Sequence, residues 1–257
     1  MSRPTDYAII TGASSGIGRA LSFAMAREGH NLLLISRNKA SLKKLCAELT
    51  DLYDISAEYI SVDLTKAADM DRCLTEIKRR KGSLTHLINN AGVGHYGTTM
   101  AADMPTLESL MQLNMMSVVR LCRELVPLMP RGGRIMNVSS LAAFFPGPMM
   151  ATYYASKSFV LRFSLALDYE LREQGVSVTT LCPGPTSTAF AQTAQADKLR
   201  LFQRTSMTAE RVARVGLRGM GRRRRVVVVG MKNKLFVQLR RLLPQRLITH
   251  LVARSQR

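Results

Sequence analysis

The chain has 257 residues, 46% of them hydrophobic and 21% charged, and its formal net charge is +19. This length and composition are typical of one large folded domain with a substantial core, and nothing in them indicates a division of the chain. The four cysteines lack CxxC or Cys/His clustering, so neither a metal site nor a disulfide framework is indicated: Cys46, Cys73, Cys122 and Cys182.

The sequence begins without a long apolar segment, and no run reaches the roughly 18 apolar residues of a membrane span. We therefore expect a cytoplasmic protein, with peripheral membrane contact left open. The charge is unevenly distributed, because residues 1–210 hold 23 basic and 18 acidic side chains whereas residues 211–257 hold 14 basic and no acidic ones. The excess charge belongs to the C-terminal part, and the rest of the chain has the balance of an ordinary enzyme.

Short apolar runs alternate along the chain with longer segments of helical pattern. The runs predict strands at residues 8–11, 31–35, 57–63, 84–90, 133–140, 176–183 and 226–229, and the intervening segments predict helices at 16–28, 39–50, 66–80, 106–129 and 152–173. Near-continuous apolarity indicates strands that are covered on both faces. The prediction is an α/β fold with a doubly wound parallel sheet of the Rossmann type, which binds ligands beyond the carboxyl ends of its strands.

The stretch YAIITGASSGIGRAL, residues 7–21, runs from the first strand through a glycine-rich turn into the first helix. Glycines at 12, 16 and 18 leave backbone N–H groups uncovered at a helix start, where the peptide dipoles favour a phosphate. Glycines also mark ordinary strand-to-helix turns, so this spacing alone leaves both interpretations open.

The end of the second predicted strand indicates which dinucleotide would bind. A carboxylate there would suit the ribose of NAD and repel the 2′-phosphate of NADP. This sequence has Ser36 and Arg37 instead, and a hydroxyl and a guanidinium favour the phosphate. The alternative is that Arg37 is simply a solvated surface charge. The expected cofactor is NADP(H).

Three motifs follow one another along the chain: TGASSGIG in the glycine-rich turn, NNAG at 89–92 and PGPTST at 183–188. They resemble the TGxxxGxG motif, the second signature and the PG motif of the short-chain dehydrogenase/reductase family, and the resemblance covers about residues 6–190. The resemblance implies that Asp63, beside Leu64, receives the adenine amino group, and that Thr186 and Thr188 lie near the nicotinamide amide and the pyrophosphate. The other cofactor-binding residues that it implies are Gly12, Ser14, Ser15, Gly16, Ile17, Gly18, Asn90, Ala91, Gly92, Pro183 and Gly184.

The stretch Asn137–Lys157 contains the residues that would carry the chemistry. Reduction of a carbonyl by hydride needs a hydrogen-bond donor and then a proton, and tyrosine can supply both if a nearby cation lowers its pKa. Tyr153 and Lys157 share a helix face, whereas the residue four positions after Tyr154 is an uncharged serine. Tyr153 is therefore the predicted acid/base, and Lys157 both lowers its pKa and binds the nicotinamide ribose.

Two further residues follow from the resemblance. Ser140 stands thirteen residues before Tyr153, as in the family, and is preferred to Ser139 for binding the carbonyl oxygen because neighbouring strand residues face opposite ways. Asn114 matches the family's helix asparagine, which supports a water that relays protons to the lysine. The predicted catalytic set is Asn114, Ser140, Tyr153 and Lys157.

These residues predict an NADPH-dependent oxidoreductase that reduces a ketone or aldehyde to an alcohol. The substrate would be bound by residues 93–97, 141–152 and the segment after Thr188, where apolar side chains indicate a pocket for a 3-oxoacyl, steroid-like or aromatic carbonyl: Phe144, Phe145, Met149, Met150, Phe190 and Phe202. The alternatives are that several of these side chains pack in the core, and that the protein is an NADP-binding redox-sensing regulator. Nucleic acid is an unlikely partner because recognition motifs and stacking platforms are missing.

Residues 1–230 form the predicted catalytic domain and residues 231–257 a basic amphipathic extension. Leucines at 235, 239, 242, 247 and 251 would lie along one side of two helices broken near Pro244, with arginines at 240, 241 and 246 on the other side. Such helices can lie on an anionic membrane or pack on the body of the protein or on a partner subunit. We expect a homodimer or homotetramer.

Overall fold

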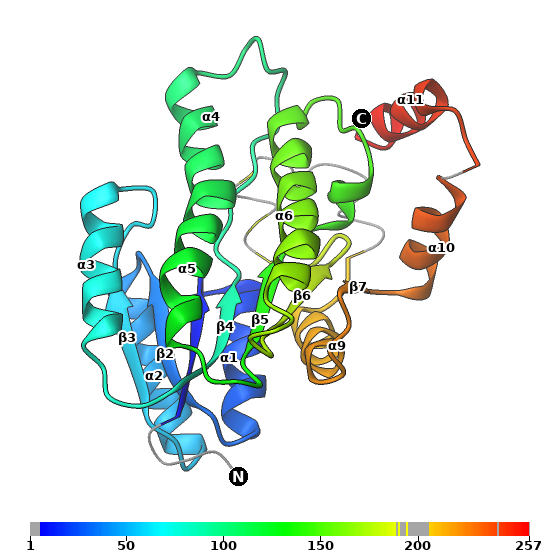
Figure 1. Cartoon of the computed structure of the whole chain (residues 1–257). Coiled ribbons are helices and arrows are strands. Elements are labelled where there is room, and N and C mark those ends of the chain that lie inside the picture. The colour runs from blue at the N-terminus through cyan, green and yellow to red at the C-terminus, as the bar shows by residue number, and fades with distance from the viewer. Residues whose placement is uncertain (1–5, 189, 191–193, 195–205, 241, 257) are drawn as a thin grey trace.

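The computed structural model describes residues 6–188, 190, 194, 206–240 and 242–256. A parallel sheet with helices on both faces forms the centre of the molecule (Figure 1). Its seven strands lie in the order β3-β2-β1-β4-β5-β6-β7, with every neighbouring pair parallel. The strands are β1 (Tyr7–Thr11), β2 (Asn31–Ser36), β3 (Ala57–Ser61), β4 (Leu84–Asn89), β5 (Arg134–Val138), β6 (Ser177–Cys182) and β7 (Val226–Val228). The predicted doubly wound Rossmann fold is confirmed.

The central strands are apolar at successive positions because each face of the sheet is covered. Ile10 of β1 packs into the cluster formed with α1 (Gly16–Arg27), α2 (Lys39–Leu52) and α9 (Ala209–Gly221), whereas Ile9 packs into the cluster on the other face. That second face is covered by α3 (Ala67–Lys78), α5 (Ser117–Leu125) and α6 (Ala151–Glu170). Successive strand residues thus serve opposite layers.

The segment predicted as one helix at 106–129 is interrupted in the structure. It consists of α4 (Met104–Met111), a π-helical turn (Gln112–Met116), α5 and a short 3-10 turn (Val126–Leu128). The N–H of Ser117 donates to the carbonyl of Gln112, five residues earlier. A π turn inside a helix is common at functional sites, and this one contains Asn114.

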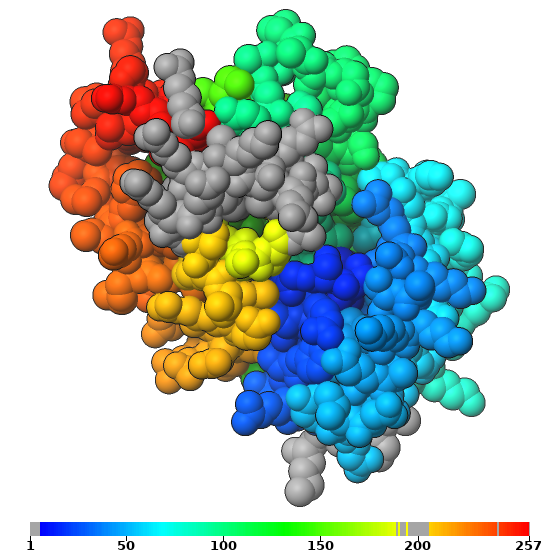
Figure 2. Space-filling model, turned by 180° about the vertical axis from the view of Figure 1, so that it is seen from behind, coloured from blue at the N-terminus to red at the C-terminus, as the bar shows by residue number. Residues whose placement is uncertain are grey.

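The basic C-terminal part divides between the two ends of β7. The run Arg222–Arg225 forms the turn between α9 and the amino end of β7, where the Arg225 guanidinium pairs with Asp168 at 2.8 Å. After the carboxyl end of β7 come α10 (Met231–Leu239) and α11 (Gln245–Ser255), on the flank of the molecule away from α3 (Figure 2). The arginine run therefore does not belong to the surface formed by these two helices.

α10 and α11 pack on the body through residues other than the predicted leucine stripe. Val237, Ile248 and Val252 are buried in a cluster with Phe145. The leucines point away from this cluster and are 42–80% exposed: Leu235, Leu239, Leu242, Leu247 and Leu251. Arg240 lies toward the body, over the ring of Phe144, and Arg241 lies outside the described residues. No helix within the described ranges is long and apolar enough to cross a membrane.

Candidate active site

The glycine-rich turn joins β1 to α1 at the carboxyl edge of the sheet. Gly12 and Gly16 have positive φ angles of 64° and 54°, which other residues rarely adopt. A Cβ on Gly18 would lie 2.2 Å from the carbonyl oxygen of Gly12, so only glycine lets α1 approach the strand this closely. Ser15, the residue before α1, makes no side-chain cap, and the helix start is therefore open to an anion.

Thr11, which is the first residue of TGASSGIG but not one of the predicted site residues, connects this turn to the NNAG segment. Its hydroxyl oxygen accepts hydrogen bonds from the backbone N–H groups of Asn90 and Ala91, both at 3.0 Å. The Asn90 side chain in turn donates to the carbonyls of Thr11 and Gly12 at 2.9 and 3.2 Å. The strands β1 and β4 are neighbours, and these bonds fix the loops that come after them.

The second strand ends beside the turn. The Ser36 hydroxyl donates to the Ser14 hydroxyl at 2.8 Å, and Arg37 is exposed next to it. Burial raises the pKa of Asp63, but hydrogen bonds from Thr65 and the positive charges of Arg37 and Lys66 outweigh this, and the pKa of this carboxyl is lowered. Asp63 is thus held as a carboxylate near Arg37. Its Oδ1 is already bonded to the N–H and hydroxyl of Thr65 at 3.0 and 2.8 Å.

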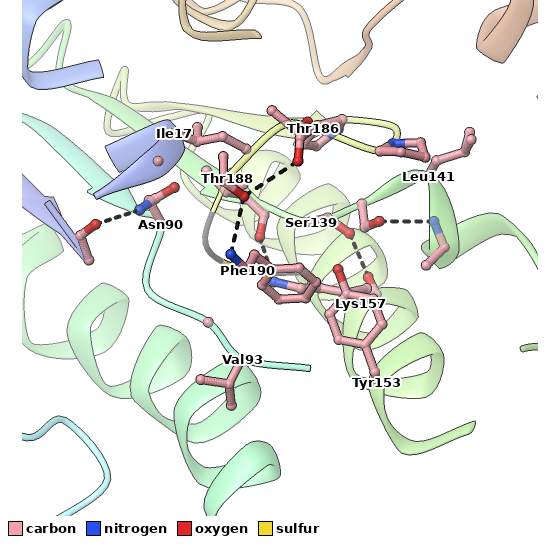
Figure 3. A pocket seen from close by; sticks show the side chains of 18 of the residues that line it. Ile17, Asn90, Val93, Ser139, Leu141, Tyr153, Lys157, Thr186, Thr188 and Phe190 are labelled. Carbon is pink, nitrogen blue, oxygen red and sulfur yellow. Dashed lines mark hydrogen bonds between the residues drawn. The ribbon is translucent and has the colours of Figure 1, made fainter. Parts of the chain in front are cut away.

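Tyr153 and Lys157 lie in the first two turns of α6 and face the cavity (Figure 3). Ser140 and Tyr153 line this cavity together, and hydrogen bonding by the Ser140 side chain acts to lower the pKa of Tyr153. Ser139 is directed differently, because its hydroxyl donates to the carbonyl of Lys157 at 2.7 Å. Of the two serines, Ser140 is therefore the one whose hydroxyl lies near the Tyr153 hydroxyl.

Burial is the main influence on the ionisation of this pair. Burial raises the pKa of Tyr153 above its usual value, and the hydrogen bond with Ser140 opposes that rise only in part. Burial also lowers the pKa of Lys157 to about 8. The ammonium donates to the carbonyl of Val138 at 3.1 Å and lies 5.8 Å from the centre of the Tyr153 ring. The Tyr153 hydroxyl therefore carries its proton at neutral pH.

Asn114 lies beneath the cavity and is 1% exposed. Its side chain accepts from the N–H of Val93 and donates to the carbonyl of the same residue, both at 2.9 Å, and it donates to the Ser156 hydroxyl at 3.0 Å. A Cβ on Gly92 would stand 3.1 Å from both Asn114 Oδ1 and Lys157 Nζ. Asn114 therefore holds the loop after β4, with Lys157 beside it.

These elements enclose one side of a cavity of about 630 Å³ at the carboxyl ends of the strands. Such a volume is ordinary for a cofactor or substrate site. All predicted cofactor-binding and catalytic residues line it except Gly18 and Asn114, which pack behind the lining. The lining also includes residues from the C-terminal helices that sequence patterns did not reveal: Lys232, Asn233, Phe236, Leu251, Val252, Ser255 and Gln256.

The apolar part of the lining includes three of the predicted pocket residues, Phe145, Met150 and Phe190. The Phe190 ring lies 5.4 Å from that of Tyr153, between centres. Phe144 and Met149 do not line the cavity, and Phe202 lies outside the described residues. The Met149 carbonyl accepts from the N–H of Gly97 at 2.7 Å, which brings two of the predicted substrate segments together.

Comparisons with known proteins agree with this geometry. The family model described as short chain dehydrogenase matches residues 6–199. A very-long-chain 3-oxoacyl-CoA reductase from Phaeosphaeria nodorum is 36% identical over 180 residues, which are 67% of this chain and 52% of that relative. The chain belongs to the short-chain dehydrogenase/reductase family. It spans about half the length of this curated relative.

Two solved structures extend the likeness over nearly the whole chain. A short-chain dehydrogenase from Sphingobium yanoikuyae in complex with NADPH has a TM-score of 0.83 and 30% identity, covering 92% of this chain and 94% of that one. The bulky-bulky ketone specific alcohol dehydrogenase from Comamonas testosteroni has a TM-score of 0.78 and 28% identity, covering 92% of each chain.

Proposed function

We propose that the chain is an NADPH-dependent oxidoreductase that reduces the carbonyl of an apolar ketone or aldehyde, such as a 3-oxoacyl, steroid-like or aromatic ketone. The observation that carries this proposal is the common cavity: an open helix start lines one part of it, and Ser140, Tyr153 and Lys157 line another. The NADPH complex of the Sphingobium relative and the ketone named for the Comamonas relative support it.

The residues present fit a nicotinamide dinucleotide. The uncapped start of α1 suits the pyrophosphate, and the glycines of the turn give the backbone room to approach it. Ser36 and Arg37 would hold the 2′-phosphate, Asp63 and Leu64 the adenine, and Asn90 to Gly92 the adenosine ribose side. NADPH, when bound, supplies the hydride.

Tyr153 acts as the proton donor in this proposal. A neutral phenol in a buried site can donate a hydrogen bond to a carbonyl oxygen and then a proton to the oxyanion that forms. Ser140, which lines the cavity with Tyr153, would hold the same oxygen. Lys157 would bind the nicotinamide ribose and place positive charge beside the phenol, and Asn114 would support the water that returns protons to Lys157.

The test is NADPH oxidation measured against a panel of carbonyl compounds of graded size. Tyr153→Phe keeps the ring but removes the proton, so turnover should fall by a factor on the order of a hundred or more. NADPH should still bind, and Tyr154→Phe, the matched control, should leave turnover nearly unchanged. If Tyr154→Phe abolished turnover and Tyr153→Phe did not, the assignment of the acid would be wrong.

A redox-sensing regulator is the second candidate function, since it too would bind NADP(H). A regulator requires the residues that bind the dinucleotide, but it does not require Ser140, Tyr153 and Lys157 to line one cavity together. NADPH binding without oxidation by any carbonyl in the panel, and unchanged in Tyr153→Phe, would favour the regulator.

We also propose that α10 and α11 dock on an anionic lipid surface. Eight of the fourteen exposed large hydrophobic side chains that the structure describes lie between Met231 and Leu251. Five basic and no acidic residues accompany them in residues 231–256 outside the undescribed position: Lys232, Lys234, Arg240, Arg246 and Arg254. An apolar face flanked by cations gains from both burial and attraction to anionic headgroups, about 1 kcal/mol for each cation near the surface.

The exposed face continues into the cavity, which connects this surface to the proposed substrate. Phe236 and Leu251 are 43% and 42% exposed and also line the cavity. An apolar path thus runs from the helices to the site, as a lipid-like ketone would need. The experiment is sedimentation with phosphatidylserine and phosphatidylcholine vesicles at low and high salt.

Binding should require the anionic lipid, weaken at high salt and fall in the double variant Leu242→Ser, Leu247→Ser. The double variant Leu52→Ser, Met100→Ser, at exposed positions outside the two helices, is the matched control and should bind normally. No binding to either vesicle would refute the proposal. If the same leucine variant instead dissociated an oligomer, the face would be the contact of the expected homodimer or homotetramer.

A further inference from the structure

Three segments far apart in the sequence meet at Gln256, just after α11. Its Nε2 donates to the Tyr154 hydroxyl at 2.6 Å, and its backbone carbonyl accepts from the Tyr96 hydroxyl at 3.0 Å. Gln256 is 1% exposed although its neighbours Arg254 and Ser255 are exposed. The C-terminal segment is thereby attached to the loop after β4 and to the start of α6.

Tyr154 is confined on its other side by Gly147. A Cβ on Gly147 would lie 2.2 Å from the Tyr154 ring, so the ring packs directly on the glycine backbone. The ring of Tyr153 lies 6.1 Å away, in an edge-on arrangement. The backbone at Gly147 and the amide of Gln256 therefore fix both the plane and the outer end of the Tyr154 ring, next to the proposed acid.

Folding stability does not account for a glutamine here. Its Oε1 is buried and has no hydrogen-bond partner in the part of the chain that the structure describes. An unpaired buried acceptor costs stability, so an apolar side chain of similar volume would pack at lower cost. What the amide adds is a directional bond to the Tyr154 hydroxyl.

Both partners of this bond line the cavity, together with Val252 and Ser255. We propose that Gln256 is a specificity-determining residue. By holding the Tyr154 ring in place, it sets the volume that is available to one of the two groups attached to the substrate carbonyl. It takes no part in hydride or proton transfer. This inference rests on the proposed carbonyl reduction. The Tyr96 hydroxyl, which donates to the Gln256 carbonyl, holds the backbone of this residue in place.

The test compares acetophenone with benzophenone, which differ in the bulk of one group on the carbonyl. Gln256→Leu keeps the volume and removes the bond, and Tyr154→Phe removes the same bond from the other side. Each should change the ratio of kcat/KM for the two ketones by about threefold to tenfold, the range that one hydrogen bond is worth, chiefly through KM. NADPH affinity and kcat should stay near their original values.

The double variant separates this role from general loosening of the fold. If the two residues act through one bond, Gln256→Leu with Tyr154→Phe should change the ratio no more than either single change does. His250→Ala, at an exposed position of α11 that does not line the cavity, is the matched control and should leave the ratio unchanged. Additive effects, or a ratio that stays constant in both single variants, would overturn the proposal.

A wild-type protein that oxidises NADPH with no carbonyl of the panel would refute the proposed function and not this inference. In that case, calorimetric titration of the protein with each ketone decides the matter. The same variants should change the ratio of the two dissociation constants, and an unchanged ratio would overturn the role of Gln256.

Discussion

Acidification should destabilise this fold through His86, a buried histidine at the amino ends of the strands, away from the cavity. His86 on β4 is 8% exposed, its ring lies 4.7 Å from that of His30, and it stands opposite Arg134 in the sheet. Burial, helped by the charges of His30 and Arg134, lowers the pKa of His86 to about 3. The folded chain therefore leaves His86 neutral where the unfolded chain binds a proton.

The magnitude of the effect depends on the two pKa values. Above the pKa of His86 in the unfolded chain, about 6.5, the full free energy of unfolding is present. As the pH falls from there toward the pKa in the folded chain, the unfolded chain takes up a proton that the folded chain does not, and the free energy of unfolding decreases. Between about pH 7 and pH 5 the loss from His86 alone should be about 2 kcal/mol. Burial also lowers the pKa of His30, which adds a loss of the same sign.

Urea unfolding followed by circular dichroism measures this, since the chain contains no tryptophan. His86→Phe keeps a planar ring and should remove most of the loss between these two pH values. His250→Phe, at an exposed position of α11, controls for the removal of a histidine. Parallel loss of stability in the wild type and His86→Phe would refute the reasoning.

Three further perturbations probe the cofactor and the site. Arg37→Asp should reverse a preference for NADPH over NADH of at least about tenfold in dissociation constant, with Lys39→Asp as control; equal affinities in the wild type would contradict the assignment. Thr11→Val leaves two loop N–H groups without their acceptor and should lower stability by about 2 kcal/mol and weaken NADPH binding, whereas Thr11→Ser should do neither. Gly92→Ala places a methyl group 3.1 Å from Lys157 Nζ and should lower kcat on the order of tenfold or more, while an unchanged kcat would show that this ammonium can move freely.

The sheet could be predicted because its signal is local. Each central strand is apolar at consecutive positions, as Ile9 and Ile10 illustrate by serving opposite layers. The glycine-rich turn and the Tyr153–Lys157 spacing are equally local, and the structure brings both to one cavity. Short-range patterns of this kind can be interpreted from the sequence alone, because the periods of the strand and the helix fix which residues share a face.

The features that escaped prediction depend on contacts across long sequence separations. The bond between Gln256 and Tyr154 joins residues 102 positions apart, and nothing near either residue indicates it. The stripe of leucines correctly indicates helices after residue 230, but the periodicity cannot tell which face packs inward. Val237, Ile248 and Val252 fill the space beside Phe145, and this leaves the leucines outside.

Because the π turn at Gln112–Met116 contains Asn114, the number of residues in this segment matters for the site as well as for the helix. Such a turn accommodates one residue more than an α-helical turn, so removal of a single residue there would restore a regular helix while α4 and α5 keep their places. The change would then fall on Asn114 and on its bonds to Val93 and Ser156. A shortened chain of this kind would keep its helices and lose the bonds by which Asn114 holds the loop after β4, at a cost in stability. A single-residue deletion in this segment would therefore act on the cavity, where Gly92 and Lys157 lie beside Asn114.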